Sequence, residues 1–188
     1  MNVFDFDNTI YDGESSLDFF LFSMRRQPSL VRYLPLILYS TLRYKMKLLS
    51  IERLYAATAK LSGAIAANSE NMDAYVDEFW KLNNRRLKKS ITDMISSEDV
   101  IITASAGFLV RGALKWLNTD NLISSEFDPI QGRFTVLCYR DNKPDLFRER
   151  YPDVQVENFY TDSLNDAPFM KIARNCWIVK GERVTILS

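Results

Sequence analysis

Histidine is absent from this sequence, and that absence excludes more chemistry than any other feature. Without an imidazole there is no histidine-ligated metal site and no Ser-His catalytic pair, so an acid or base must be Asp, Glu, Lys, Tyr or Cys. Cysteine is scarce as well. Cys138 and Cys176 lie far apart in apolar runs, so we expect two reduced, packed thiols in a reducing compartment.

The chain also lacks an excess of basic residues, since 24 Lys and Arg balance 24 Asp and Glu. General nucleic-acid binders usually carry such an excess, so we expect no nucleic-acid partner. The most apolar stretch, residues 30–42, is interrupted by Arg32 and Pro35 and is too short for a membrane helix, so we expect no stable membrane insertion. The start of the chain has no basic region followed by an apolar run, so we expect a cytoplasmic protein. The oligomeric state stays open.

The strongest positive signal is the opening segment, where a short apolar run ends in Asp5 and Asp7, followed by Thr9. Residues two apart on a strand point to one face, and a buried face should not carry two unpaired carboxylates. The strand should therefore end near Asp5, with both carboxylates facing something cationic. A divalent metal with a phosphate group fits this requirement.

Residues 15–95 are predicted to be helical, with no convincing strand. Helical spacing and start signals predict helices over 17–24, 30–49, 51–63 and 70–87, with Gly63 ending the third. Pro35 predicts a kink or break in the second.

From Asp99 onward, short apolar runs alternate with helical patterns. Strands are expected at 100–103, 121–127, 133–139, 156–161 and 176–179, with an edge strand at 184–187, and helices at 107–117, 144–150 and 164–173. Such alternation predicts an α/β fold, a doubly wound, Rossmann-like and mostly parallel sheet. The expected domains are a core of residues 1–13 and 96–188 and an inserted all-helical cap of residues 14–95.

Polar residues stand where the predicted strands end or the next helix starts. They are Asp5 and Asp7, then Thr103, Lys143 and Asp162. Ligands of parallel sheets bind at the carboxyl ends of strands, so these groups can converge on one crevice. A carboxylate can attack a phosphate if Mg²⁺ and a lysine neutralise the charge and a hydroxyl holds the phosphoryl oxygens.

These residues carry a resemblance to a known family. The segment Asp5-Phe-Asp-Asn-Thr9 resembles the DxDxT first motif of the haloacid dehalogenase (HAD) superfamily of phosphotransferases. Thr103 and Lys143 resemble its second and third motifs, and Asp162-Ser-Leu-Asn-Asp166 its acidic fourth motif, in the family's order. The helical insert resembles the cap of the phosphoserine-phosphatase-like branch.

The resemblance implies a role for each matching residue, with Mg²⁺ as cofactor. Asp5 would be the nucleophile and a metal ligand, and Asp7 would be the general acid/base, with its backbone carbonyl bound to the metal. Thr103 would bind the phosphoryl group, and Lys143 would stabilise its charge. Asp162 would be a direct metal ligand, and Asp166 would support the metal site through water or Lys143.

Two further residues are candidates for substrate binding. Ser105, in Ser-Ala-Gly-Phe, resembles the Ser-Gly-Gly-Phe stretch of phosphoserine phosphatases, so an alignment shifted by two would make it the second-motif residue. Thr103 is preferred because it directly follows the predicted strand. Glu14 stands nine residues after Asp5, where those enzymes place the acid that holds the substrate amine, although relatives with other substrates also carry an acid there.

The resulting hypothesis is a Mg²⁺-dependent phosphatase that acts through an aspartyl-phosphate on a small-molecule phosphate ester, either a small metabolite or a lipid-like one. Asp7 disfavours a haloalkanoate dehalogenase, because it implies proton delivery to an alkoxide. The alternatives are a phosphoaccepting, receiver-like signalling module and a catalytically silent binding protein. The basic residues of the insert, Arg25, Arg26, Arg32, Arg43, Lys45 and Lys47, are interpreted as a solvated face or, less favourably, as recognition of an acidic substrate.

Overall fold

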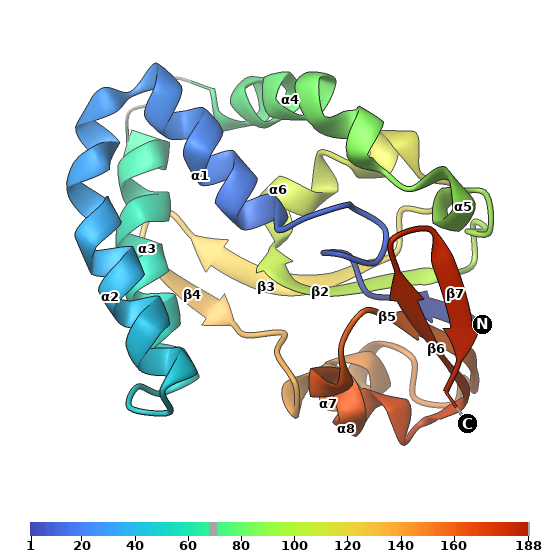
Figure 1. The fold of residues 1–188 in the computed structure, drawn as a ribbon. Coiled ribbons are helices and arrows are strands. Elements are labelled where there is room, and N and C mark those ends of the chain that lie inside the picture. Colours follow the sequence, from blue (N-terminus) through green and yellow to red (C-terminus); the bar gives the residue numbers. More distant parts are fainter. Residues whose placement is uncertain (68–70, 188) are drawn as a thin grey trace.

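The computed structural model describes residues 1–67 and 71–187. At its centre is a seven-stranded sheet in the order β4-β3-β2-β1-β5-β6-β7 (Figure 1). The strands are β1 (Asn2–Phe4), β2 (Val100–Ala106), β3 (Leu122–Asp128), β4 (Arg133–Val136), β5 (Val156–Thr161), β6 (Ala173–Lys180) and β7 (Arg183–Ile186).

The five inner strands are, in order across the sheet, β3, β2, β1, β5 and β6, and they run parallel to one another. The edge strands β4 and β7 are antiparallel to their neighbours. Strand β1 lies in the middle, with Phe4 paired to Ile101 of β2 and to Tyr160 of β5. The predicted α/β class with a mostly parallel sheet is therefore confirmed, including the edge strand near the C-terminus.

Side chains alternate between two buried layers, one on each face of the sheet. Phe4, Ile101 and Tyr160 belong to a large aromatic cluster, and Phe4 and Tyr160 stack with ring centroids 4.5 Å apart. Val3 and Phe159 point to the other face, where they belong to a smaller cluster with Phe147 and Phe169. This alternation with a period of two is what burial on both faces of a parallel sheet requires.

Helices cover both faces. They are α1 (Ser15–Arg26), α2 (Leu34–Lys45), α3 (Ile51–Ala67), α4 (Met72–Asn83), α5 (Lys89–Thr92), α6 (Gly107–Arg111), α7 (Asn142–Arg150) and α8 (Ala167–Met170), with short 3₁₀ turns η1 (Pro28–Tyr33), η2 (Asn84–Arg86), η3 (Leu114–Trp116) and η4 (Leu164–Asp166). Helices α7 and α8 lie on the opposite side of the sheet from α4 and α6 (Figure 1).

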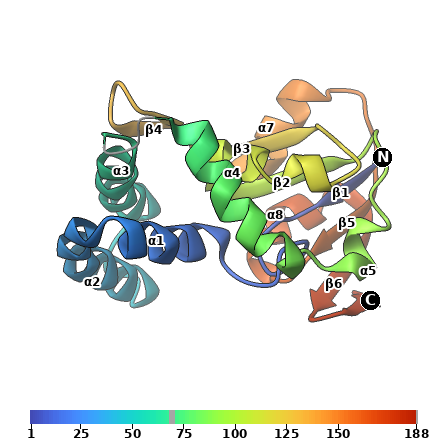
Figure 2. The same ribbon diagram turned by 90° about the horizontal axis from the view of Figure 1, so that it is seen from above.

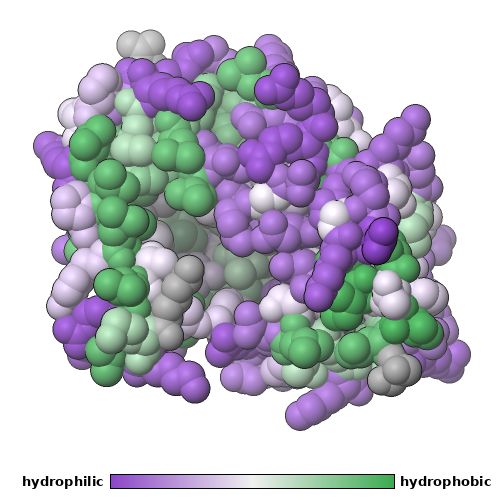
Figure 3. Space-filling view, viewed as in Figure 1, coloured by the Kyte–Doolittle hydropathy of each residue, from purple (hydrophilic) through white to green (hydrophobic). Residues whose placement is uncertain are grey.

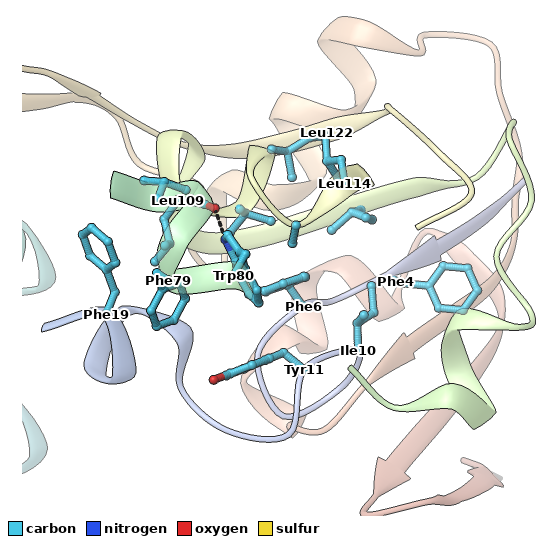
Figure 4. Close-up of a cluster of buried hydrophobic side chains, with 14 of the residues drawn as sticks. Phe4, Phe6, Ile10, Tyr11, Phe19, Phe79, Trp80, Leu109, Leu114 and Leu122 are labelled. Carbon is cyan, nitrogen blue, oxygen red and sulfur yellow. Dashed lines mark hydrogen bonds between the residues drawn. The ribbon is translucent and has the colours of Figure 1, made fainter. Parts of the chain in front are cut away.

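Helices α1 to α3 form a group beside the sheet, here called the helical unit (residues 15–67), whereas α4 crosses over the sheet (Figure 2). Trp80 of α4 is fully buried, and its indole N–H donates to the Leu109 carbonyl over 2.7 Å (Figure 4). The division into domains at residues 14 and 95 stays a prediction.

Several predicted element boundaries were wrong. Helix α3 continues through Gly63 to Ala67, because Leu61 and Ile65 on either side of the glycine are buried. That packing outweighs the roughly 1 kcal/mol that a glycine costs inside a helix. Pro35 does break the helix expected over 30–49, as it becomes the second residue of α2 after η1.

Other predicted elements are shorter or longer in the structure. The fourth predicted helix begins only at Met72, and its expected start at Glu70 lies outside the described residues. The helices expected over 107–117 and 164–173 divide into short helices and 3₁₀ turns. The strand expected over 133–139 stops at Val136, and β2 extends past Thr103 to Ala106.

Candidate active site

The loop after β1 begins the candidate site. The strand ends at Phe4, as expected from the two aspartates that follow. The Phe6 carbonyl accepts the amides of Ile10 and Tyr11, each over 2.9 Å, which folds the loop tightly. Phe6 and Tyr11 are fully buried and both pack edge-on against Trp80 (Figure 4). Strand β1 therefore fixes the start of this loop, next to Asp5, and the packing of Phe6 and Tyr11 on α4 fixes the part of the loop that carries Asp7.

Asp5 shares a buried ion-pair network with two residues from distant parts of the chain. The Lys143 ammonium group, near the start of α7, donates to Asp5 Oδ1 and to Asp166 Oδ2, each over 2.9 Å. Asp166 Oδ2 also accepts from the Thr161 hydroxyl over 3.0 Å. Lys143 is only 3% exposed, so one lysine joins the ends of β1 and β5 away from solvent.

The electrostatics of this network are unbalanced. Burial raises the pKa of Asp5 to about 7, against the attraction of Lys143, and nearby Asp166 and Asp7 raise it further. Burial alone would lower the pKa of Lys143, but Asp5 and Asp166 outweigh burial and raise it. Because the carboxylates of this network outnumber its single lysine, an additional cation would stabilise their charged forms.

Asp7 is held by two donors. Its Oδ1 accepts the Ser15 amide over 2.7 Å, and its Oδ2 accepts the Ser105 hydroxyl over 2.5 Å. Burial raises the pKa of Asp7, while these hydrogen bonds lower it. A carboxyl group with a raised pKa takes up a proton more readily than a free carboxyl group does, which suits a general acid/base.

The two candidates for the second motif both lie in β2 and interact with each other. Thr103 was expected to follow the strand directly, and this is wrong, because β2 continues to Ala106. The pairing of β2 with β3 is irregular between Ile102 and Ala106, where the Thr103 side chain accepts the Ser105 amide over 3.0 Å. Both residues are buried, and the Ser105 hydroxyl donates to Asp7. The assignment of the phosphoryl-binding role to Thr103 or Ser105 stays a prediction.

Asp162 comes one residue after β5, the strand adjacent to β1. Burial raises the pKa of its carboxyl group, Asp166 raises it further, and Lys143 lowers it, so Asp162 lies within electrostatic range of the network. Among the described residues, no side chain donates a hydrogen bond to the Asp162 carboxylate, and a hydrogen bond with its own backbone lowers the pKa that burial raises.

The donor set fits Mg²⁺ in a limited sense. Within residues 1–67 and 71–187, no three acidic or cysteine side chains come together as a metal-binding group. Both carboxylate oxygens of Asp7 accept hydrogen bonds, and Asp166 accepts from Lys143 and Thr161. Asp5 accepts from Lys143 through Oδ1, so its Oδ2, the Asp162 carboxylate and the Asp7 carbonyl are the candidate ligands. Mg²⁺ usually takes one or two carboxylates and completes its shell with water and substrate phosphate, so two carboxylates are sufficient.

Glu14, the second substrate-binding candidate, is the exposed residue that precedes α1. Its carboxylate accepts the Asn8 side-chain amide over 2.7 Å. Asn8 has a left-handed backbone with φ of 58°. Glu14 is thus tied to the loop that carries Asp7 rather than to the amides of α1.

Sequence reasoning missed two residues that position this site. Lys88 is buried and donates to the Asn8 carbonyl. Tyr55 of α3 donates to the carbonyl of Ala104, between the two second-motif candidates, over 2.8 Å. Neither has a local signal, since Lys88 stands in a basic run and Tyr55 in an ordinary helical pattern.

An open cavity of about 660 Å³ lies between the helical unit and the core. One wall comes from Tyr44, Lys47 and Ser50, and the other from loop residues that include Arg140 and Asn165. The space-filling view shows a hollow between the helical unit and the sheet (Figure 3). Asn165 directly precedes Asp166 of the network, so the cavity adjoins the candidate site.

The cavity walls carry unusual backbone conformations. Among the described residues, the non-glycine residues with positive φ are Asn8, Lys47 and Arg140. Lys47 and Arg140 face the cavity from opposite walls, and Asn8 belongs to the loop after Asp7. Such conformations cost on the order of 1–3 kcal/mol each and concentrate at functional sites. The arrangement as a whole suits an anionic ligand that reaches from this cavity toward Lys143.

Comparison with known proteins places these observations in a family. The sequence profile of the haloacid dehalogenase-like hydrolase family matches residues 3–171. A search of curated proteins found no match.

Solved structures share the fold. A protein of unknown function from Bordetella pertussis Tohama I has a TM-score of 0.66 at 20% identity, covering 91% of this chain and 85% of its own. A phosphoserine phosphohydrolase-like protein from Francisella tularensis has a TM-score of 0.56 at 19% identity, with coverages of 94% and 86%. A HAD family hydrolase from Salmonella enterica has a TM-score of 0.52 at 12% identity, with coverages of 91% and 59%.

Proposed function

Because the chain belongs to the haloacid dehalogenase-like hydrolase family, we propose that it is a Mg²⁺-dependent phosphomonoester hydrolase that acts through an aspartyl-phosphate. The observation that carries the proposal is the buried network in which Lys143 bonds to Asp5 and Asp166. Asp7, two residues after Asp5, stands ready as an acid/base, held by Ser15 and Ser105.

In the first step, a carboxylate oxygen of Asp5 attacks phosphorus, and the bond from phosphorus to the ester oxygen breaks. Asp7, in its protonated form, gives its proton to the departing oxygen. Lys143 stabilises the charge on the phosphoryl oxygens, and the hydroxyl of Thr103 or Ser105 donates to one of them.

In the second step, Asp7 takes a proton from a water molecule whose oxygen attacks phosphorus. The bond from Asp5 to phosphorus then breaks, which restores the carboxylate and releases inorganic phosphate. Asp7 ends protonated and is ready for the next cycle. Mg²⁺, held by Asp5, Asp162 and the Asp7 carbonyl, would neutralise the charge that the nucleophile and the phosphate bring together.

The substrate is proposed to be a small or lipid-like phosphorylated metabolite. The cavity beside the network supports this, because it can hold the group beyond the phosphate. The likeness in fold to a phosphoserine phosphohydrolase-like protein supports phosphatase chemistry, with residues 14–95 as the proposed cap. Glu14 would contact the substrate, as the resemblance implies.

The proposal is tested with a panel of phosphate monoesters, assayed for released phosphate with Mg²⁺ and with EDTA. We expect turnover of at least one ester that needs Mg²⁺ and is lost in Asp5→Asn. Asp12→Asn is a matched control, since Asp12 is an exposed acid of the same loop whose side chain has no hydrogen bond among the described residues. Turnover that persists in Asp5→Asn would exclude Asp5 as the nucleophile. A phosphorylated Asp5 that is stable for hours would instead support a phosphoaccepting module.

A further inference from the structure

The helical unit contains a stretch of unusual charge. Between Asp18 and Glu52 the sequence has no acidic residue, although the chain has 24. The same stretch has six basic residues, in a protein whose formal net charge is zero. This concentration of positive charge is therefore a local property of the segment that includes η1 and α2.

Helix α2 is apolar on both of its faces. Leu34 and Ile37 pack against the aromatic cluster of the core, as one face of a surface helix should. Leu38 and Leu42, four residues apart and thus on one face, are 60% and 59% exposed. Met46, four residues further on, is 59% exposed. An exposed apolar stripe on a protein surface often marks an interaction site, so this stripe indicates a binding partner.

Exposed apolar side chains also flank α2 in the sequence. Val31 before α2 and Leu48 after it are 51% and 56% exposed. Tyr39 lies beside the stripe, and together these side chains form what is here called the α2 face: Val31, Leu38, Tyr39, Leu42, Met46 and Leu48. Figure 3 shows apolar side chains gathered along the edge of the molecule where α2 lies in Figure 1.

Cations flank the α2 face without acidic partners. Arg32 and Lys47 are exposed, and neither forms an ion pair within the part of the chain that the structure describes. Arg43 donates to the Tyr39 hydroxyl rather than to a carboxylate. A second copy of the chain on this face would bring like charges together, so a negatively charged partner fits better.

We propose that the α2 face docks the protein on an anionic phospholipid bilayer. An amphipathic helix with apolar side chains on one face and flanking Lys and Arg lies in the bilayer interface, with its apolar face among the acyl chains. The cations gain from the negative surface potential. No helix in the described residues is long and apolar enough to cross a bilayer, so the association is peripheral.

Docking would also bring the cavity to the lipid headgroups. Lys47 lines the cavity, and the exposed Leu48 follows it directly. An amphiphilic phosphate monoester could then enter from the bilayer without leaving its apolar surroundings completely. This last step, unlike docking itself, rests on the proposed function.

The test is co-sedimentation of the full chain with vesicles of phosphatidylcholine alone or with about one-third phosphatidylglycerol. We expect binding to the anionic vesicles only, decreasing as salt is added. Leu42→Glu should weaken binding at least about tenfold, because a charge replaces an immersed side chain. The double variant Arg32→Gln, Lys47→Gln should also weaken binding to the anionic vesicles. The expected loss is about fivefold for each cation removed, because each contributes about 1 kcal/mol near an anionic surface.

Leu82→Glu is the matched control, since Leu82 is 56% exposed but belongs to α4. It should bind as the wild type does, and circular dichroism should show both glutamate variants folded. Asp5→Asn should also bind normally, so docking and catalysis can fail separately.

Three results would overturn docking. The first is a wild type that stays in the supernatant with both kinds of vesicle. The second is equal weakening by Leu42→Glu and Leu82→Glu. The third is a dimer in solution that Leu42→Glu converts to a monomer, with no vesicle binding, because a second copy would then cover the α2 face.

Discussion

Replacing Lys143 by methionine tests whether the buried network has the geometry described above. Methionine keeps most of the apolar length of lysine but removes the ammonium group. In the wild type that group bonds to Asp5 and Asp166, each over 2.9 Å, and is 3% exposed. The substitution therefore leaves two buried carboxylates without their cation.

The expected loss is large. Removing one partner of a buried ion pair typically costs about 3–5 kcal/mol, because an uncompensated buried charge remains. Asp166 keeps its hydrogen bond from Thr161, which limits the loss on that side. We therefore expect the free energy of unfolding to fall by about 3 kcal/mol or more in EDTA. The same variant should lose phosphatase activity.

The assay is urea unfolding in EDTA, followed by tryptophan fluorescence, with Lys115→Met as the matched control. Lys115 pairs with Asp77 over 2.6 Å, but both side chains are more than two-fifths exposed. Exposed pairs contribute about 0–1 kcal/mol, so the control should change little. Adding Asp166→Asn to Lys143→Met should recover part of the loss, since it removes one of the two unpaired charges.

The contradicting result is a loss in the free energy of unfolding that is no larger for Lys143→Met than for Lys115→Met. That result would mean that Lys143 is not enclosed between the two carboxylates in solution. A double variant less stable than Lys143→Met would also count against the network, because neutralising Asp166 would then give no relief.

Three further changes have defined outcomes. Asp7→Asn should lower the rate of phosphate release by roughly 10²–10⁴-fold, measured at saturating substrate, because the proton shuttle is lost, and an unchanged rate would exclude that role. Trp80→Phe should lower the free energy of unfolding by about 0.5–1.5 kcal/mol in urea, because the Leu109 carbonyl loses the indole donor and keeps only the Gly112 amide, and a neutral effect would mean that the indole bond adds no net stability. Burial raises the pKa of the Cys138 thiol to about 12, so at pH 8 this thiol should resist alkylation until urea unfolds the chain, and rapid labelling of folded protein would contradict its burial.

The fold class could be predicted because its signals are local. Short apolar runs that alternate with helical patterns require a covered parallel sheet, and the run at 156–161 coincides with β5. The same logic put Asp5, Lys143 and Asp162 at element ends, where parallel strands bring them to one edge. The contact between Asp5 and Lys143 follows from this topology, so their proximity could be predicted from one sequence, whereas the roles of these residues stay predictions.

Details that depend on long-range packing could not be predicted. The end of β2 depends on its irregular pairing with β3, which no local pattern near Thr103 reveals. The burial of Lys88 depends on the loop after β1, far away in the sequence. From the local sequence, Gly63 predicts the end of a helix. The helix continues because Leu61 and Ile65, on either side of the glycine, are buried, and the local sequence does not reveal that burial.

Two tyrosines link the helical unit to the candidate site, and this has a mechanical consequence. Tyr55 donates to the Ala104 carbonyl within the irregular part of β2, and the Tyr44 hydroxyl hydrogen-bonds to that of Tyr139 in the loop before α7. Those two core segments carry the candidate phosphoryl-binding hydroxyls and, four residues after Tyr139, Lys143. A displacement of the helical unit would therefore break contacts to both sides of the site at once. If the proposed function holds, the same two side chains would therefore couple any opening of the cavity to the alignment of the candidate phosphoryl-binding groups.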